Sequence, residues 1–234
     1  MNDPIGLAIS DFYENGQADD IRIQTNYTED EHIAPAYFFR AEQEMPIIER
    51  RALKLSKGKI LDVGAAAGSH SLWLQEQGFE VTALEKSELA ASVMKKRGVK
   101  RVVCSDLFDF YDEKFETILV LMNGTGIGGT CSGLKKMLIH LKNLLSENGV
   151  ILIDSSNIQY LFEEEDGSMW VNLSDTSYYG EMEYEVSYRK SYTSFKWLFT
   201  DYEKLDEIAR EAGLVSKKIV DGEHFDYLAQ LSHE

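Results

Sequence analysis

Between residues 59 and 156, short runs of hydrophobic residues alternate with stretches in which hydrophobic residues repeat at helical spacing. The longest run, residues 118–122, is typical of a central parallel strand that is buried on both faces. Because strands that alternate with helices are joined by right-handed crossovers, the pattern predicts an α/β fold with a mostly parallel, doubly wound sheet. Its strands are expected at residues 60–63, 80–84, 102–104, 115–122 and 150–154.

The segment before this alternation, residues 1–57, has mainly helical signals. Asp3 and Pro4 predict the start of a helix that ends at Gly16. Residues 28–31 match a capping box, which predicts the start of a short second helix. Pro46 opens a third helical pattern. We therefore expect residues 1–57 to form a helical arm or lid, followed by the main domain at residues 58–234.

A different period appears in the last third of the chain. Over residues 181–188, hydrophobic and polar residues alternate strictly, and Phe195, Trp197 and Phe199 repeat the alternation after a break. This pattern predicts an antiparallel hairpin, inserted at about residues 168–200, with one dry and one wet face. The hairpin is compatible with a structural flap at the sheet edge, and equally with a substrate cover or a dimer contact.

The chain ends with a helical pattern and two further strands. The helix is capped by Thr200 or Asp201 and stops at Gly213, and the strands are expected at residues 215–220 and 225–231. A link of three residues, 221–223, allows only antiparallel pairing, so one strand near the edge of the sheet should be reversed.

The first strand runs into a turn of very small residues at positions 64–68, and a helix follows. Gly64 can adopt backbone angles closed to other residues, and the alanines leave almost no side chain above the turn. Such a turn exposes backbone N–H groups beside a positive helix N-terminus, which suits ligand binding at the carboxyl end of a strand. About 20 residues further on, Glu85 ends the second strand, where an acidic residue commonly binds the two hydroxyls of a ribose. The ligand is therefore expected to carry a nucleoside.

Composition and charge narrow the class of partner. The 234 residues are 44% hydrophobic and carry a net charge of −16, which argues against a nucleic-acid partner because such binding depends on clustered Lys and Arg. The two cysteines have no CxxC partner and the five histidines are scattered, so no metal site is expected. No leader pattern begins the chain and no hydrophobic run approaches 18 residues, so we expect a cytoplasmic protein without a membrane span.

From residue 46 to 231, apart from the hairpin, the sequence resembles the class I S-adenosylmethionine-dependent methyltransferases. Residues 62–68, DVGAAAG, are similar to that family's first motif, an acidic residue followed by Gly-x-Gly-x-Gly around the methionine part of the cofactor. Ala66 stands where the middle glycine is usual, and an alanine is tolerated there if φ is negative. The resemblance implies S-adenosylmethionine as cofactor and a Rossmann-like sheet of seven strands in the order 3-2-1-4-5-7-6, with the last strand antiparallel. The whole chain further resembles bacterial methyltransferases of unassigned substrate.

The resemblance also assigns binding residues. It places Glu85 at the ribose, Ser105 and Asp106 at the adenine, and residues 121–124 along cofactor and substrate. The implied cofactor-binding residues are Asp62, Gly64, Ala65, Ala66, Gly68, Glu85, Lys86, Ser105, Asp106, Leu107, Met122 and Asn123. From their position in loops, the candidates for acceptor binding are Tyr37, Arg40, Asn123 and Gly124.

No catalytic residue is identified from the sequence. The fourth strand has Glu116 and Thr117 where the family often has an aspartate, and His70 is more typical of a neutral hydrogen-bonding residue. The segment of Tyr37 and Arg40 could simply fasten the arm to the sheet by aromatic packing, or it could form a lid over a flat or cationic ligand.

Two other functions share this fold. An NAD(P)-dependent oxidoreductase uses the same ribose acid, but its fingerprint G-x-G-x-x-G differs from the spacing of Gly64 and Gly68. Asp62 would also repel a pyrophosphate, whereas it can accept from the amino group of S-adenosylmethionine. A module that binds this cofactor without catalysis is the third alternative.

The methyl acceptor is not identified by the sequence. The acidic composition and the two segments outside the core favour a small molecule or a protein side chain over nucleic acid. Transfer would need the acceptor held in line about 3 Å from the methyl group. The aromatic-rich hairpin is also compatible with a homodimer contact.

Overall fold

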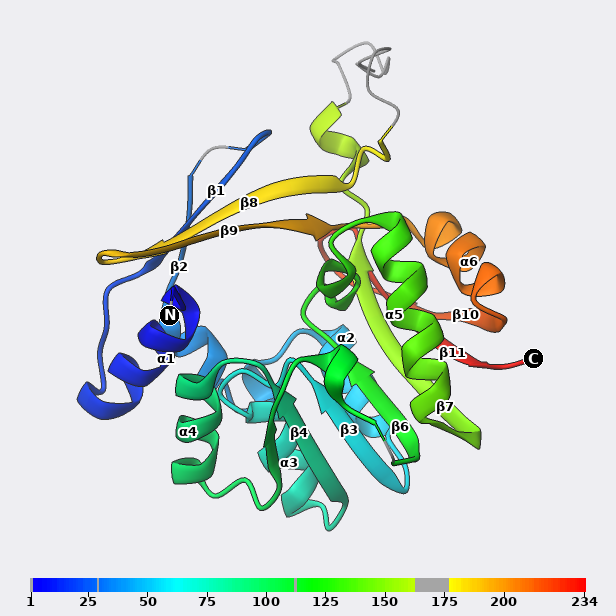
Figure 1. Ribbon diagram of the computed structural model, residues 1–234, viewed down its shortest axis with the longest axis horizontal. Helices are drawn as coiled ribbons and strands as arrows, with labels where there is room; N and C mark the ends of the chain where they lie inside the picture. Colours follow the sequence, from blue (N-terminus) through cyan, green and yellow to red (C-terminus); the bar gives the residue numbers. More distant parts are fainter. Residues whose placement is uncertain (1, 29, 112, 163–176) are drawn as a thin grey trace.

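The structure is a computed structural model that describes residues 2–28, 30–111, 113–162 and 177–234 (Figure 1). Its larger sheet has seven strands in the order β10-β11-β7-β6-β3-β4-β5. The bounds are β3 (Lys59–Val63), β4 (Glu80–Glu85), β5 (Val102–Cys104), β6 (Phe115–Val120), β7 (Leu145–Ser156), β10 (Leu214–Asp221) and β11 (Asp226–His233). Among the described strands of this sheet, only β11 runs opposite to the other six. Counted along the chain, this is the expected order 3-2-1-4-5-7-6, with the last strand reversed.

Helices cover both faces of the larger sheet, as the doubly wound pattern predicts. On one face, α2 (Ile47–Leu55) and α3 (Ser69–Glu76) pack against alternate residues of β3, β6 and β7. Beside them, α4 (Glu88–Arg97) packs on β4 and β5. On the other face lie α5 (Cys131–Leu144) and α6 (Tyr202–Glu211). Residues of the central strands therefore face one of two helical layers, which explains why these strands are mostly hydrophobic.

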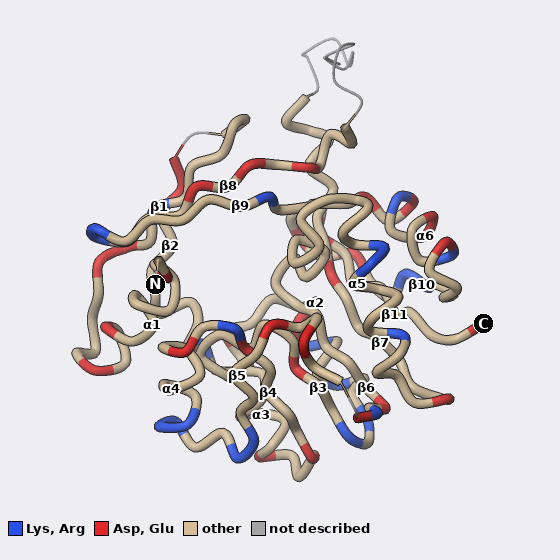
Figure 2. Tube along the Cα trace, in the orientation of Figure 1, with Lys and Arg blue, Asp and Glu red and all other residues tan. Residues whose placement is uncertain are grey.

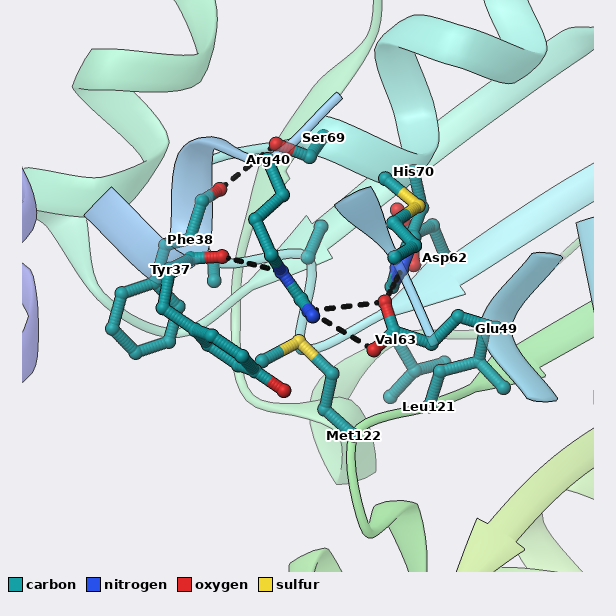
Figure 3. Close-up of a pocket in the computed structure, with 14 residues that line it drawn as sticks. Tyr37, Phe38, Arg40, Glu49, Asp62, Val63, Ser69, His70, Leu121 and Met122 are labelled. Carbon is teal, nitrogen blue, oxygen red and sulfur yellow. Dashed lines mark hydrogen bonds and ion pairs between the residues drawn. The ribbon is translucent and has the colours of Figure 1, made fainter. Parts of the chain in front are cut away.

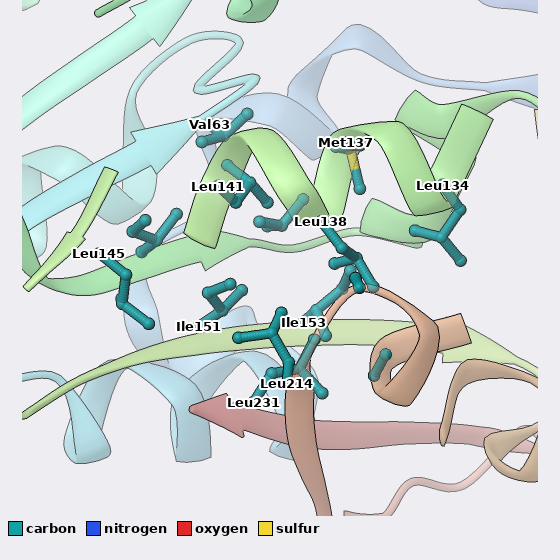
Figure 4. Close-up of a cluster of buried hydrophobic side chains, with 14 of the residues drawn as sticks. Val63, Leu134, Met137, Leu138, Leu141, Leu145, Ile151, Ile153, Leu214 and Leu231 are labelled. Atoms are coloured by element: carbon teal, nitrogen blue, oxygen red, sulfur yellow. The ribbon is translucent and has the colours of Figure 1, made fainter. Parts of the chain in front are cut away.

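The largest buried cluster lies between α5 and the larger sheet (Figure 4). On α5, Leu134, Leu138 and Leu141 repeat at helical spacing and are fully buried. They face Ile151 and Ile153 of β7. This cluster anchors β7 and β6 side by side and so fixes the carboxyl ends of both strands, where ligands bind in open α/β sheets.

A second, smaller sheet has the order β2-β1-β8-β9. Its strands are β1 (Ile21–Thr25), β2 (Glu31–Ile33), β8 (Glu181–Tyr188) and β9 (Ser191–Leu198). The hairpin of β8 and β9 confirms the antiparallel insertion, and residues 168–176 of the expected segment lie outside the described residues. In Figure 1, β8 and β9 extend across the end of the larger sheet at which β3 and β6 terminate, and β9 contacts the loop after β6.

The strands β1 and β2 were not predicted from the sequence. The capping box at residues 28–31 wrongly indicated a helix, because Glu31 begins β2. The Thr25 hydroxyl instead accepts hydrogen bonds from the N–H groups of Tyr27 and Thr28, at 3.2 and 2.9 Å, and so closes a turn between the two strands. Pairing of β1 with β8 then buries Ile21 and Ile23 against the hairpin.

The N-terminal helix α1 (Pro4–Asn15) forms as expected and ends at Gly16, which has φ 71°. Its cap, Asp3, accepts from the Gly6 N–H at 2.8 Å and from the Ser87 hydroxyl, which caps α4, at 2.5 Å. Two short 3-10 helices, η1 (Pro35–Phe39) and η2 (Glu42–Glu44), lead to α2. The N-terminal segment is thus attached to both sheets. Among the described helices, none has the length and hydrophobicity to cross a membrane.

Candidate active site

The turn after β3 exposes backbone at the carboxyl end of the strand. Gly64 and Gly68 have φ values of 69° and 83°, and a Cβ on Gly68 would lie 2.9 Å from Met94 Cγ. Ala66 also has a positive φ, 48°, so the negative value that an alanine needs is not found. This conformation costs an L-residue roughly 1–2 kcal/mol. The Ala66 N–H donates to Glu85 Oε2 at 2.9 Å, which helps to hold the turn in this geometry.

Glu85 lies at the end of β4, beside this turn. Its other carboxylate oxygen accepts from the Ser87 N–H at 2.9 Å. Burial raises the pKa of Glu85, while the two N–H donors oppose that rise. Each carboxylate oxygen accepts one of these two hydrogen bonds, so both retain acceptor capacity for a hydroxyl donor.

The residues expected at the adenine follow β5. The Ser105 N–H donates to the Glu85 carbonyl at 3.1 Å, which places this segment next to the end of β4. Asp106 is exposed and caps the short helix η3 (Leu107–Asp109) by accepting from the Phe108 N–H at 2.9 Å. Lys86 is exposed beside them.

A pocket opens where β3 and β6 end (Figure 3). It is lined by Tyr37, Phe38, Arg40, Met45, Glu49, Asp62, Val63, Gly64, Ala65, Ala66, Ser69, His70, Leu121 and Met122. Of the residues predicted from the sequence, it brings together Asp62, Gly64, Ala65, Ala66, Met122, Tyr37 and Arg40. The others lie outside its lining: Gly68, Glu85, Lys86, Ser105, Asp106, Leu107, Asn123 and Gly124.

Buried charges occupy one wall of this pocket. Arg40 Nη2 lies 2.9 and 3.1 Å from the two carboxylate oxygens of Glu49, and His70 Nε2 lies 2.7 Å from Glu49 Oε2. The Arg40 guanidinium also stacks 3.5 Å above the centre of the Tyr37 ring. Burial raises the pKa of Glu49, but His70 and Arg40 outweigh it and the net shift is downward.

The same charges act on His70. Burial disfavours the imidazolium, but the hydrogen bond to Glu49 and the charge of Asp62 outweigh it and raise the pKa of His70. The expected hydrogen-bonding role is therefore present, although the raised pKa favours the charged form. Asp62 is 2% exposed and accepts from the Ser71 hydroxyl at 2.6 Å. Burial raises the pKa of Asp62, while His70 and Ser71 oppose that rise.

Glu49 was not identified from the sequence. A signal for it exists, because Glu49 lies one helical turn before Ala52 and Leu53 and so falls on the buried face of α2. A charged residue on a hydrophobic face is almost never fully buried without a partner. Its position therefore indicates a buried ion pair, although it does not indicate which residue is the partner.

The segment from Tyr37 to Arg40 both packs and lines the pocket. The Ser69 hydroxyl donates to the Phe38 carbonyl at 2.8 Å, and the Arg97 guanidinium lies 4.7 Å from the centre of the Phe39 ring. These contacts attach the arm to the start of α3 and to the end of α4 rather than to the sheet itself.

The loop after β6 is held in an uncommon conformation. Met122 and Asn123 have φ values of 66° and 58°, and the short helix η4 (Gly124–Gly128) follows. Two glycines of this loop, Gly126 and Gly129, lie against β9 of the hairpin, so they do not offer a free surface to a ligand. A Cβ on Gly126 would overlap the Trp197 ring.

A second buried carboxyl group, Asp154, was also missed from the sequence. It is 3% exposed near the end of β7, and its Oδ1 accepts from the Gly124 N–H at 3.0 Å. Burial raises the pKa of Asp154 to about 7, against the lowering effect of the backbone N–H groups of Gly124 and Asn123. Its position near the end of a hydrophobic strand is the same signal that identified Glu85.

Comparisons with known proteins point to one family. A family described as a methyltransferase domain matches residues 61–153. The structure of a SAM-dependent methyltransferase from Bacteroides fragilis, in complex with S-adenosyl-L-homocysteine, is 41% identical, with a TM-score of 0.93 over 99% of this chain and 95% of that one. A search of curated proteins gave no match.

More distant structures share the fold. The sugar N-methyltransferase KedS8 from Streptoalloteichus sp. ATCC 53650 is 15% identical, with a TM-score of 0.58 over 90% of this chain and 97% of that one. The CcbJ methyltransferase from Streptomyces caelestis is also 15% identical, with a TM-score of 0.62 over 83% of this chain and 99% of that one. With its seven-stranded sheet and its 41% identity over 99% of its length to the Bacteroides fragilis enzyme, this chain belongs to the S-adenosylmethionine-dependent methyltransferases.

Proposed function

We propose that this methyltransferase acts on a small-molecule acceptor, bound between the pocket at the end of β3 and the smaller sheet. The observation that carries the proposal is the smaller sheet itself, which extends across the carboxyl ends of β3 and β6 (Figure 1). Its hydrophobic residues share one face, on which Tyr184 pairs with Phe195, and Trp197 of this face packs on Gly126. A site covered in this way suits a small-molecule acceptor better than a nucleic-acid duplex.

The charge distribution supports the same proposal. In Figure 2, many Lys and Arg lie at the end of α4 and at the end of the larger sheet far from β8, and others lie on α6 and at the turn between β8 and β9, while acidic residues line β8. Binding of a nucleic-acid phosphate backbone would need Lys and Arg, rather than acidic residues, near the site. The shared fold of a sugar N-methyltransferase is consistent with a small acceptor.

The residues present suit the cofactor. Asp62 is a buried carboxylate that forms no salt bridge with any cation in the described part of the chain, so an ammonium group would complement it. Arg40 uses Nε for the Tyr37 carbonyl and Nη2 for Glu49, which leaves Nη1 to donate to a carboxylate. Glu85 has acceptor capacity for ribose hydroxyls. Bound S-adenosylmethionine supplies an electrophilic methyl group. We therefore assign the amino-acid end of the cofactor to Asp62 and Arg40, and its ribose to Glu85.

The remaining sequence-based assignments complete this site as proposals. Gly64, Ala65, Ala66 and Gly68 would form the bare wall beside the cofactor. Lys86, Ser105, Asp106 and Leu107 would lie along the adenine. Met122, Asn123 and Gly124 would separate cofactor from acceptor, with Tyr37 on the opposite side.

In this proposal the chain acts mainly by positioning. It holds the acceptor in line and excludes water, which alone can supply much of the rate enhancement. His70 is tied to Glu49, so it is a poor general base. The arm, residues 1–57, and the hairpin at about residues 168–200 would close the site of the domain at residues 58–234. We also propose a cytoplasmic location, and a homodimer remains a hypothesis that size-exclusion chromatography can test.

The proposal is tested first by calorimetric titration with S-adenosylmethionine, S-adenosylhomocysteine, NADH and NADPH. We expect micromolar binding of the first two and none of the nicotinamide nucleotides. Asp62→Asn should weaken binding at least tenfold, about the 1.4 kcal/mol or more of a charge-assisted hydrogen bond. Asp109→Asn, an exposed acid on η3, is the matched control and should bind normally.

The acceptor class is then tested with cofactor that carries a labelled methyl group, incubated with a metabolite extract, with protein and with RNA. Label should leave the cofactor and appear in a new small molecule, separated from the remaining cofactor by chromatography of the ultrafiltrate. Label retained on protein or RNA would refute the small-molecule proposal while leaving the cofactor assignment intact.

A further inference from the structure

A chain of hydrogen bonds connects the smaller sheet to the loop after β6. The Thr200 N–H donates to Ser155 Oγ at 2.9 Å, Ser155 Oγ lies 2.6 Å from Thr125 Oγ1, and Thr125 Oγ1 donates to the Leu198 carbonyl at 2.9 Å. The Thr125 hydroxyl has a single proton and gives it to Leu198, so Ser155 must be the donor between the two hydroxyls. Thr125 and Ser155 are both 0% exposed, so water does not compete for these bonds.

The residues on either side of Ser155 hold the same loop. Asp154 Oδ1 accepts from the Gly124 N–H at 3.0 Å, and the Ser156 hydroxyl donates to Asn123 Oδ1 at 2.8 Å. The last three residues of β7 therefore each bond one residue of segment 123–125. At its other end, the hydrogen-bond chain reaches Leu198, the last residue of β9.

The loop needs this support. Met122 and Asn123 both have φ in the left-handed region, which non-glycine residues keep only where the surroundings over-determine it. Met122 lines the pocket (Figure 3), so the bonds that fix this backbone also fix one wall of the pocket.

We propose that Thr125 and Ser155 are positioning residues. Through their hydrogen bonds, the smaller sheet fixes the backbone conformation of Met122 and Asn123. A ligand that binds against this sheet and a ligand that binds in the pocket then change each other's affinity, because both bias the same loop. The inference rests on the proposed function for the identity of the two ligands. The mechanical link itself depends only on the hydrogen bonds described.

The test compares Thr125→Val, which keeps the shape and removes the hydroxyl, with Thr125→Ser, which keeps the hydroxyl. Thr82→Val is the matched control, since Thr82 is 0% exposed in β4 and its hydroxyl has no partner among the described residues. Ser155→Ala removes the middle donor and serves as a second variant if the valine variant does not fold. Hydrogen exchange of residues 121–126 and 191–198 is measured without ligand, and S-adenosylhomocysteine affinity by calorimetry.

We expect Thr125→Val and Ser155→Ala to raise exchange in both segments and to weaken S-adenosylhomocysteine binding about fivefold, the effect of one net hydrogen bond. Thr125→Ser should restore both, and Thr82→Val should match the wild type. Unchanged exchange in the loop, or failure of the serine variant to rescue, would overturn the proposal. If the wild type does not bind S-adenosylhomocysteine, the cofactor assignment fails instead, and the exchange data still test the link.

Discussion

The Glu49 carboxylate and the His70 imidazole lie 2.7 Å apart in the wall of the pocket, on helices α2 and α3. Glu49 is 2% exposed and His70 is 9% exposed, so water screens their interaction little. Arg40, which lies in the N-terminal arm, forms an ion pair with the same carboxylate. One buried acid therefore ties three segments of the chain together at the proposed cofactor site, and its charge sets the ionisation of its neighbours.

The first prediction concerns the ionisation of His70. Its pKa is raised above the ordinary 6.5, so its contribution to stability is complete below pH 6.5 and is lost as pH rises through the folded-state pKa. Glu49 has a pKa below 4.5, so its contribution is present above pH 4.5 and is lost as pH falls through the lower value. An NMR titration of the His70 ring should show a pKa above 6.5 in the wild type and a lower one in Glu49→Gln.

The same substitution should destabilise the fold. It leaves Arg40 and His70 buried without their anion, and removal of one partner from a buried ion pair typically costs about 3–5 kcal/mol. Urea denaturation at pH 6 measures this loss. Glu76→Gln, an exposed acid on α3, provides the control and should change stability little. A Glu49 variant as stable as the control would show that the network adds nothing to folding.

The second prediction follows from the positive φ of Ala66. Ala66→Gly removes a strain of roughly 1–2 kcal/mol, and the greater freedom of glycine in the unfolded chain offsets about 0.5–1 kcal/mol of this. We expect a net stabilisation of about 0.5–1 kcal/mol, measured by chemical denaturation.

Ala67→Gly is the matched control for this substitution. Ala67 is the next residue in the turn, is 0% exposed and is not among the positive-φ residues of the described chain. It gains no relief of strain and loses a buried methyl group, so it should be destabilising by about 1 kcal/mol or more. Equal losses in the two variants would mean that the turn does not hold Ala66 under strain.

The third prediction tests the contact of the hairpin with the loop. In Gly126→Ala the new methyl group would overlap the Trp197 ring, so β9 must move away from the loop. We expect a loss of about 1–3 kcal/mol in stability, typical of overpacking, together with faster hydrogen exchange in β9. Combining Gly126→Ala with Trp197→Ala removes the overlap, so the double variant should lose less than the sum of the single losses. Simple additivity would contradict the contact.

Much of the fold could be predicted from the sequence because its signals are local. Periodicity over residues 59–156, the helix caps and the short link before β11 specify the larger sheet with its reversed strand. The smaller sheet was predicted only in part. Its hairpin alternates along the chain, whereas β1 is short and is stabilised by β8, more than 150 residues away. Tertiary pairing of this kind overrides a capping signal at residues 28–31.

Residues of the pocket could be predicted where a single residue type at the end of a strand is enough to indicate a role. Asp62, the glycine turn and Met122 lie together at the pocket as the motif pattern indicates. The partners of Arg40 were not predictable, because Glu49 and His70 come from different helices and meet only in the folded chain. The conformation of Ala66 was also missed, since φ depends on the hydrogen bond that Glu85 supplies from the next strand.

The last prediction concerns Asp154. Burial raises its pKa from 3.8 to about 7, so the folded state favours the neutral acid. The folded protein then holds more protons than the unfolded chain between these values, and stability must fall as pH rises from about 4 to about 7. Asp154→Asn keeps an oxygen for the Gly124 N–H but cannot ionise, so it should escape this loss, which amounts to at most about 4 kcal/mol. Urea denaturation at pH 5 and pH 8 should therefore show a smaller decline for Asp154→Asn than for the wild type, whereas the exposed Asp109→Asn should follow the wild type. Parallel declines in all three proteins would mean that Asp154 is already ionised below pH 5, with its charge satisfied by the backbone N–H groups of the loop.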